Sequence, residues 1–462
     1  MKINQEIRRL TRKVNGKLTT VFAPEHLESL ARQSEFIQRS SSQLRGRDLV
    51  ELMTTEMLED PAISLEGQCD ILAQLNPQAQ ITPQALHQRI NANAVSYLQE
   101  VFAVALRQQL EPLCKRLPVG VLAPFGRVLL EDSTQCSLHE KLADAFKGCG
   151  GSASTSALKL DVIYDVVHHT LVEIHLSDGK AADQGRALAI VPYLRPGDLV
   201  LRDLGYLSLE SLRQIEAQEA WYLSRLSKGV DVYLESDAQA PALALVEHLD
   251  RYYRDDSEID LPVYIGHERV PCRLLAYRLP DPVVQERRRK ALEEARKKGR
   301  TLTQEYLNWL AFGFYITNVT REVLPGKVVR IVYSLRWQVE LMFKNWKSLL
   351  NLHLLKGTRP ERIKCILYGR LITIVMLAMV SSYAAWYVED YLHKELSIPK
   401  LINWLKRKGR FAKAMHVGTL EDLFNNLRRA LPKRLCKQKR KRRTSRQLLE
   451  DFGYYLQDVL VA

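Results

Sequence analysis

The 462-residue sequence predicts a mixed α/β fold with helical regions at both ends. Apolar residues recur at helical spacing over about the first 115 residues, and short strand-like runs begin near residue 120. From there the order is strand, strand, strand, helix, strand, helix, strand, which is typical of a mixed sheet with flanking helices. With 46% hydrophobic and 26% charged residues, the composition is that of a folded globular chain, not of a disordered, collagen-like or coiled-coil one.

The N-terminal region is predicted to be helical. Its first helix has an apolar face with Ile3, Ile7, Leu10 and Val14 and a basic face with Arg8, Arg9 and Arg12. Further helices are expected over residues 24–38, 46–59 and 82–113. The basic face is either a solvated surface or a surface that contacts phosphate groups, and the sequence leaves both interpretations open.

Two apolar runs in the middle of the chain end at similar acidic corners. Residues 128–130 form a short strand that stops at Asp132, and residues 199–201 form another that stops at Asp203. Between them, alternating residues over 158–166 and 172–176 predict two more strands, and a helical stretch is expected over 181–194. A helix over 207–217 and a strand over 221–225 follow. The sequence thus places one aspartate at the end of each of two strands.

Residues 230–318 interrupt this alternation and are interpreted as an insertion. Short strand-like pieces at 231–234, 261–265, 272–279 and 312–317 surround a helical stretch, 285–300, that holds eight basic and three acidic residues. Beyond the insertion, the most apolar run, residues 371–388, reaches the 18-residue length of a membrane span. Because this run contains Ser381, Ser382 and Tyr383 and stands alone, we expect a buried core helix.

The charge balance favours a polyanionic partner. The 67 Lys and Arg exceed the 53 acidic residues, and the resulting net charge of +14 is typical of chains that contact nucleic acid or an anionic membrane surface. The segment 433–446 holds nine basic residues and no acidic one, which predicts a DNA-backbone contact or a disordered tail. The seven cysteines include no CxxC pair, which argues against a zinc ribbon or a disulfide framework and fits a reducing cytosol. No apolar signal-peptide core follows the basic N-terminus, so export is not expected.

The most informative segment is 332–350, which contains no Gly or Pro and is predicted to form one helix. At about 100° per residue, Tyr333, Arg336, Glu340 and Lys347 fall within an arc of roughly 60°. Such a face is compatible with a solvated surface that contains an Arg to Glu pair. The spacing YxxRxxxExxxxxxK, however, matches at every position the signature of the insertion sequence four family of transposases, which the chain resembles over roughly residues 120–390.

This resemblance implies a DDE transposase, in which an RNase H-like sheet holds two aspartates at strand ends and a later helix holds a glutamate. The corner at Asp132 resembles the first acidic site of the family, and Asp203 with Gly205 and Tyr206 resembles the second. Glu340 resembles the third. The family has a β-rich insertion between the second and third acidic residues, which agrees with the change of pattern after residue 230.

The expected domain organisation follows from these patterns and from the resemblance. Residues 1–120 are a helical N-terminal DNA-binding domain, and 121–229 are the first part of the RNase H-like catalytic core. Residues 230–318 are the β-rich insertion domain, and 319–395 are the second part of the core. Residues 396–462 are a basic helical C-terminal region.

Three carboxylates suit the chemistry of phosphodiester cleavage. In-line displacement is promoted by two hard cations about 3.5–4 Å apart, which activate the attacking oxygen and stabilise the departing one. Mg²⁺, with Mn²⁺ as a substitute, prefers carboxylate oxygens. We therefore expect Asp132, Asp203 and Glu340 to be the catalytic residues and to bind two metal ions per active site.

Four further residues are assigned to DNA. Arg336 and Lys347 share the Glu340 face, where their charges are expected to meet DNA phosphates, and Tyr333 is expected to hydrogen-bond the same backbone. Arg225, in the strand after the second aspartate, resembles a recurrent arginine of the family.

Two groups of residues each allow two interpretations. Trp309 and Phe312 either stack on a base extruded at the transposon end, as family members do, or are buried in the core of the insertion. His168, His169 and His175 form either a metal site or part of a polar turn, and the expected hairpin favours the turn.

The resemblance implies a metal-dependent enzyme of DNA recombination. It would bind the terminal inverted repeats of an insertion sequence, cleave the element ends and join the 3′ hydroxyls to target DNA, in cut-and-paste transposition. Double-stranded DNA and a second copy of the chain in a synaptic complex are the expected partners, and no membrane is. The expected location is the bacterial cytoplasm, on the nucleoid when DNA is bound. Two alternatives stay open: a transposase-derived DNA-binding protein without strand transfer, and an RNase H-like nuclease.

Overall fold

The computed structural model describes residues 2–39, 42–56, 60–110, 120–151, 154–254, 256, 258–407 and 420–438. The chain divides into two compact units. The first unit comprises Met1–Arg116, Ser133–Ala181 and Val339–Lys441. The second unit comprises Leu117–Asp132, Ala182–Gln338 and Arg442–Ala462. Two elements cross the division along the chain: strand β1 (Val128–Ser137) and helix α13 (Trp337–Leu349).

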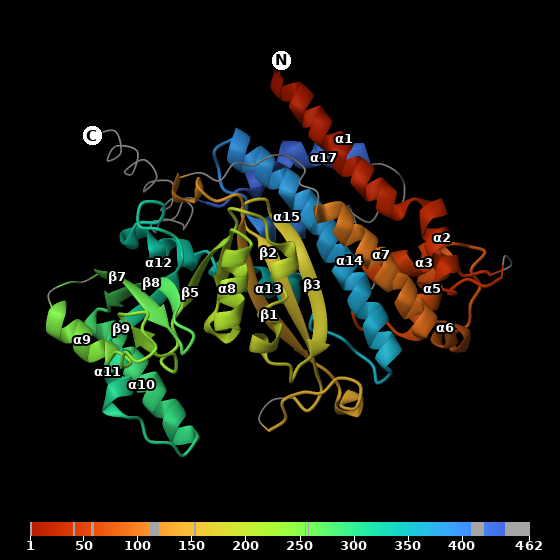
Figure 1. Ribbon diagram of the computed structural model, residues 1–462. Coiled ribbons are helices and arrows are strands. Elements are labelled where there is room, and N and C mark those ends of the chain that lie inside the picture. The colour runs from red at the N-terminus through yellow and green to blue at the C-terminus, as the bar shows by residue number, and fades with distance from the viewer. Residues whose placement is uncertain are drawn as a thin grey trace. The chain divides into compact units, whose positions relative to one another are not determined.

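The first unit is mainly helical (Figure 1). Its N-terminal helices are α1 (Lys2–Phe22), α2 (Pro24–Gln33), α3 (Gly46–Glu51), α5 (Leu65–Leu75), α6 (Pro83–Arg89) and α7 (Ala92–Leu110). Its later helices are α13, α14 (Pro360–Ala385), α15 (Ile398–Lys406) and α17 (Leu420–Ala430). Helices α7 and α14 pack on each other and on strand β3 (Thr170–Asp178), which pairs antiparallel with β2 (Ala157–Asp165). Strand β2 in turn neighbours β1.

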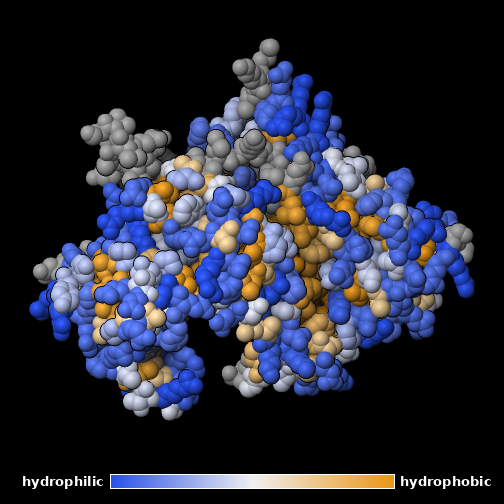
Figure 2. Space-filling view, viewed as in Figure 1, coloured by the Kyte–Doolittle hydropathy of each residue, from blue (hydrophilic) through white to orange (hydrophobic). Residues whose placement is uncertain are grey.

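Helix α1 is amphipathic as predicted. Ile7, Leu10 and Val14 are buried, whereas Arg8 and Arg9 are exposed. Hydrophilic side chains accordingly cover the part of α1 that is visible in Figure 2. The basic face is therefore exposed to solvent, and Arg9 on it pairs with Glu6.

Helix α14 is the core helix that the apolar run predicted. It is the one helix among the described residues that is long and apolar enough to cross a membrane. However, 83% of its most apolar 18-residue window is buried inside the protein. Its burial extends to Arg370, whose guanidinium donates to the carbonyl oxygen of Leu354 at 2.9 Å. Burial lowers the pKa of this guanidinium to about 10.

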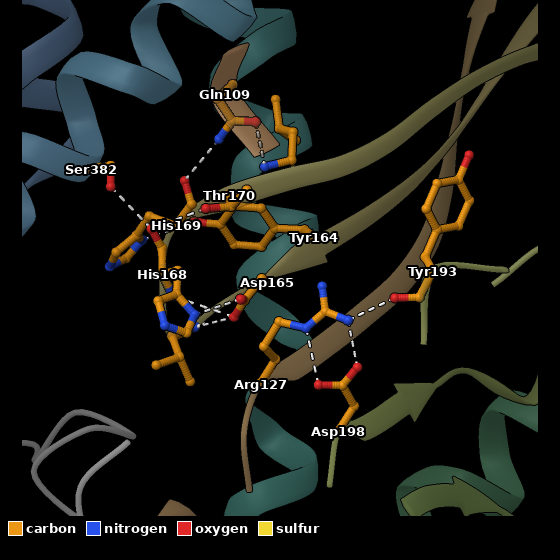
Figure 3. Close-up of polar contacts among 12 residues, drawn as sticks. Gln109, Arg127, Tyr164, Asp165, His168, His169, Thr170, Tyr193, Asp198 and Ser382 are labelled. Carbon is orange, nitrogen blue, oxygen red and sulfur yellow. Dashed lines mark hydrogen bonds and ion pairs between the residues drawn. The ribbon is translucent and has the colours of Figure 1, made fainter. Parts of the chain in front are cut away.

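The turn between β2 and β3 is the polar turn that the sequence favoured (Figure 3). The ring Nδ1 of His168 lies 2.6 Å from one carboxylate oxygen of Asp165, and the other oxygen accepts backbone N–H groups of Val167 and His168. The Ser382 hydroxyl donates to the His168 carbonyl oxygen, which fixes the turn to α14. His175 lies on β3, opposite Asp161 of β2. The three histidines therefore belong to a folded hairpin.

The second unit is built on one sheet with the strand order β1-β4-β5-β9-β8-β7-β6. Its strands are β1, β4 (Leu199–Arg202), β5 (Trp221–Arg225), β6 (Val232–Tyr233), β7 (Glu258–Ile265), β8 (Val270–Arg278) and β9 (Phe312–Thr317). Its helices are α8 (Leu209–Ala217), α9 (Leu245–Tyr252), α10 (Asp281–Lys297), α11 (Gln304–Trp309) and α12 (Gly326–Ser334). Strands β1, β4 and β5 are parallel, and the others pair antiparallel. The strands of residues 230–318 thus continue this sheet through the β5–β9 pair.

The order β3-β2-β1 in the first unit and β1-β4-β5 in the second gives the mixed α/β, RNase H-like arrangement that was expected. Within the first unit β1 neighbours the antiparallel hairpin β2–β3, and within the second unit β1, β4 and β5 are parallel. The long side chain of Arg127 fixes the beginning of β1 to the beginning of β4. It forms an ion pair with Asp198 and donates to the Tyr193 carbonyl oxygen at 2.7 Å (Figure 3).

Several predicted helices differ from the structure, among them 82–113, which is two helices, α6 and α7. Residues 181–194 contain only short 3₁₀ turns, Asp183–Arg186 and Val191–Tyr193, because Gly185 and Pro192 interrupt any longer helix. The predicted helix over 332–350 is two helices, because α12 ends at Ser334 and α13 begins at Trp337.

Close packing of α14 provides a test of the core. A Cβ atom at Gly369 would collide with the main-chain oxygen of Met53, whereas a Cβ atom at Gly16 of α1 would meet nothing within 4 Å. We expect Gly369→Ala to lower the free energy of unfolding by about 1–3 kcal/mol. The control Gly16→Ala should raise the free energy of unfolding by up to about 1 kcal/mol, because alanine has a higher helix propensity than glycine. Urea unfolding measures both, and equal stability of the two variants would contradict this account of α14.

Candidate active site

Three neighbouring strand ends carry the residues that the sequence singled out. Glu131 of β1 pairs in register with Arg202 of β4, and Arg202 pairs with Ser224 of β5. The residues that follow this row are Asp132 in β1, Asp203 directly after β4, and Arg225 in β5. Neighbouring strands lie about 4.8 Å apart, and in-register side chains of parallel strands share a face of the sheet. Asp203 keeps an extended backbone, with φ −79° and ψ 166°, so this alternation continues through it.

Strand β1 does not stop at Asp132 as predicted. It continues to Ser137, while its pairing with β4 ends at Glu131 because β4 leaves the sheet at Arg202 and turns through Leu204–Tyr206. Asp132 is consequently half-buried, at the point where β1 loses one of its two neighbouring strands. An acidic side chain at such a point is held by the sheet and remains accessible.

Arg336 is the direct partner of Asp132. Its Nη1 lies 2.9 Å from the Asp132 Oδ2, and both side chains are largely shielded from water. The sequence assigned Arg336 to DNA phosphates, but the structure gives it a carboxylate partner inside the protein. A charge-assisted contact of this length fixes the orientation of the carboxylate.

Tyr333 is buried beside Asp203. Its hydroxyl donates to the carbonyl oxygen of Arg202 at 3.0 Å, and its ring packs edge-on against Tyr315 at 5.0 Å between centroids. Burial, reinforced by the negative charge of Asp203, raises the pKa of Tyr333. The phenol therefore stays protonated and acts as a donor to the protein backbone, which differs from the DNA contact expected for it.

The break between α12 and α13 explains how both contacts form. The backbone N–H of Arg336 donates to the Tyr333 carbonyl at 3.1 Å, and that of Gln338 donates to Leu335 at 2.8 Å, as in a tight 3₁₀ turn. The four motif residues therefore do not lie on one continuous helix, as the sequence predicted. Local sequence lacks a helix breaker here, so the turn reflects the tertiary partners of Tyr333 and Arg336.

Glu340 and Lys347 lie on α13 within the first unit. Glu340 is half-buried. Lys347 lies close enough to Cys136 to oppose the effect of burial, which raises the pKa of that thiol to about 11. Whether Glu340 joins Asp132 and Asp203 stays a prediction from the motif.

The donor chemistry of the strand ends suits a hard divalent cation. Asp132 and Asp203 offer carboxylate oxygens, which Mg²⁺ and Mn²⁺ prefer. Within the described part of the chain, no group of three or more His, Cys, Asp or Glu residues is arranged to hold a metal. Asp132 and Asp203 each follow a residue of the in-register pair Glu131 and Arg202, and their role as metal ligands stays a prediction.

The two aromatic candidates of the insertion differ in burial. Phe312 is 1% exposed and stacks on Phe314, with the Arg278 guanidinium over its ring at 4.7 Å. Stacking of Phe312 on a base is therefore wrong, because its ring belongs to the core of the sheet. Trp309 is half-buried, and its ring centroid lies 4.1 Å from that of Phe314. Its stacking on a base stays a prediction.

Two features near the strand ends were overlooked or left general. Trp337 is 55% exposed and directly follows Arg336, so an indole ring adjoins the site; an aromatic residue inside the motif was the available signal. Arg225 has no side-chain hydrogen bond or ion pair with the described residues and lies near a second cation, Arg287.

The basic segment 433–446 lies outside the described residues from 439 onward.

Comparison with known proteins agrees with the motif. The model of the transposase DDE domain family matches residues 123–376. The transposase for insertion sequence element IS231F of Bacillus thuringiensis subsp. israelensis is 29% identical over 409 residues, 84% of each chain. The IS231B transposase of Bacillus thuringiensis subsp. berliner is 30% identical over 367 residues, 76% of each chain. A piggyBac transposase synaptic complex with hairpin DNA aligns at a TM-score of 0.45 and 10% identity, covering 93% of this chain and 87% of that one.

The Tyr333 contact predicts a measurable contribution to stability. Tyr333→Phe removes the donor to the Arg202 carbonyl and should lower the free energy of unfolding by about 1 kcal/mol. The control Tyr252→Phe changes a 63% exposed ring and should have no effect. Denaturant unfolding of both variants checks this, and an unchanged midpoint for Tyr333→Phe would show that the hydrogen bond does not hold the strand end.

Proposed function

This chain belongs to the DDE transposases of the insertion sequence four type, and we propose that it cleaves and joins DNA beside Asp132 of β1, where the neighbouring strands β4 and β5 end. It is a DNA transposase, an enzyme that depends on divalent metal ions. One observation supports this proposal above all: Asp132, Asp203 and Arg225 each follow a residue of the in-register row Glu131, Arg202 and Ser224 in three neighbouring parallel strands.

The metal ligands in this proposal are Asp132, Asp203 and Glu340. Two Mg²⁺ ions, or Mn²⁺ in their place, would supply activation of the attacking oxygen and stabilisation of the departing one. The chain would contribute the ligands from three elements: one aspartate from β1, one from the residue after β4, and the glutamate from α13. The motif is what assigns Glu340 to this set.

The neighbouring side chains are proposed to orient and neutralise charge. Arg336 restrains the Asp132 carboxylate, and Tyr333 restrains the backbone before Asp203. Arg225, with no carboxylate partner among the described residues, is suited to a DNA phosphate. Lys347 is proposed to contact DNA as well, and the exposed Trp337 is suited to stacking on a base.

The DNA partners follow from this assignment. We propose that the substrates are the terminal inverted repeats of an insertion sequence and a target duplex, with a homodimer in the synaptic complex. The net charge of +14 and the exposed basic face of α1 support extensive phosphate contacts. Action on the bacterial nucleoid in the cytoplasm fits such a role.

Removal of single carboxylates tests the function. We expect Asp132→Asn, Asp203→Asn and Glu340→Gln each to abolish cleavage of labelled element ends while DNA binding survives, because affinity comes mainly from phosphate contacts. Gel analysis with Mg²⁺ and a supercoiled target separates joined products, hydrolysed ends and a shifted but uncut band. Joined products support the transposase, hydrolysed ends alone favour a nuclease, and uncut complexes of the native chain favour a binding protein.

The control for these variants is Glu235→Gln, an exposed carboxylate of the unit that contains Asp132 and Asp203. It should cleave and join like the native chain. Full cleavage by Asp132→Asn or Asp203→Asn would exclude the strand ends as the active site.

Arg225 should act on DNA through its charge. We expect Arg225→Ala to weaken binding to element ends and to reduce the slope of log affinity against log salt by about 1, as for the loss of one phosphate contact. Arg225→Lys should keep the slope. Arg251→Ala, which removes an exposed arginine of α9, is the control. Binding measured by fluorescence anisotropy over a range of salt concentrations checks this, and an unchanged slope for Arg225→Ala would remove Arg225 from the interface.

A further inference from the structure

A buried ion pair lies directly behind the two aspartates. Glu131 precedes Asp132, Arg202 precedes Asp203, and the two residues are partners in the β1–β4 register. The Arg202 Nε lies 2.8 Å from a Glu131 carboxylate oxygen. Glu131 is 2% exposed and Arg202 is 1% exposed, so the pair is removed from water.

The pair occupies the opposite face of the sheet from the aspartates. Successive side chains of a strand point to opposite faces, so Glu131 and Arg202 share one face while Asp132 and Asp203 share the other. On its own face Arg202 donates to the Ser211 hydroxyl of α8 at 2.8 Å and to the Ala187 carbonyl oxygen at 2.7 Å. The guanidinium therefore joins β1, β4 and α8.

The main chain of Arg202 is held as firmly as its side chain. Its carbonyl oxygen accepts the Tyr333 hydroxyl, and its backbone pairs with both β1 and β5. Arg202 is thus fixed at its side chain by Glu131, Ser211 and Ala187, and at its main chain by Tyr333 and two strands. The residue that follows it, Asp203, inherits this position.

We infer that the Glu131–Arg202 ion pair is a positioning device that keeps Asp132 and Asp203 side by side, an inference that rests on the proposed role of these aspartates. A slip of one residue between the strands would send one aspartate to the other face of the sheet. The slip would also leave two buried charges unpaired, which is strongly unfavourable. An apolar pair would tolerate the slip better, so the charges provide the specificity.

The same two strands carry a matched control at their other end. Arg127 and Asp198 precede β1 and β4 and form a second, largely buried ion pair. About four residues of strand, roughly 13 Å, separate that pair from the aspartates. Its loss should reduce stability without altering the spacing of Asp132 and Asp203.

The test compares three variants of the full-length chain. Glu131→Gln removes one charge at nearly constant shape, Asp198→Asn does the same at the far end, and Glu131→Leu with Arg202→Met replaces the whole pair by apolar side chains. Each is assayed for thermal unfolding, for cleavage of element ends, and for Mn²⁺ binding from the free-ion signal in electron paramagnetic resonance. Mn²⁺ is the probe because it substitutes for Mg²⁺ and is paramagnetic.

We expect Glu131→Gln to lose about 10- to 100-fold in cleavage, the effect of a displacement near 1 Å at a catalytic group, and to bind Mn²⁺ more weakly. Asp198→Asn should lose stability but keep cleavage and Mn²⁺ binding within about threefold of the native chain, because it lies roughly 13 Å from the aspartates and leaves the Glu131–Arg202 pair in place. The double variant should regain stability and remain slow. Cleavage that follows stability alone in all three variants, or native cleavage by the double variant, would overturn the inference.

One further variant separates this inference from the proposed function. If Asp132→Asn abolishes cleavage while Glu131→Gln leaves cleavage and Mn²⁺ binding unchanged, the ion pair is structural only and the active site stands. If Asp132→Asn cleaves normally, the proposed function fails together with the positioning role.

Discussion

The parallel pairing of β1 with β4 is the constraint on which the rest of the site depends. Four backbone positions, from Val128 with Leu199 to Glu131 with Arg202, set which residues stand next to each other where β4 ends. An arginine to carboxylate pair lies at each end of this short ladder. Because a parallel ladder this short holds few hydrogen bonds, charged partners that fit in one register only are an effective means of fixing it.

Strands β7 and β8 of the insertion help to fix the position of helix α12, which carries Tyr333. Arg273 of β8 pairs with Asp260 of β7 and donates to the carbonyl oxygens of Val319 and Leu324, in the connection that leads from β9 to α12. The Tyr277 hydroxyl donates to the carbonyl oxygen of Gly326, where α12 begins. These contacts fix the start of the helix whose end carries Tyr333. The insertion therefore helps to position Tyr333 and Arg336, in addition to any contact it makes with DNA.

Patterns that depend on neighbouring residues were predictable from the sequence. Strands β5 and β9 have the predicted bounds, and α14 is the predicted core helix, because alternation and continuous apolar runs reflect burial directly. The predictions that were wrong concern features that depend on contacts between residues distant in the sequence. No local signal marks the turn at residues 335 and 336. Nothing in the neighbouring sequence distinguishes the buried Phe312 from the half-buried Trp309 either, because their burial depends on packing between strands.

By itself the sequence determined the family, and it placed Asp132 on one strand and Asp203 directly after another, because fixed spacing and short apolar runs are written in the chain. Tertiary structure alone decided what each motif residue touches. Arg336 meets Asp132 and Tyr333 meets the backbone of Arg202, although 204 and 131 residues separate these partners in the sequence. Such contacts arise when strands and helices from remote segments are packed together, and no periodicity along the chain encodes them.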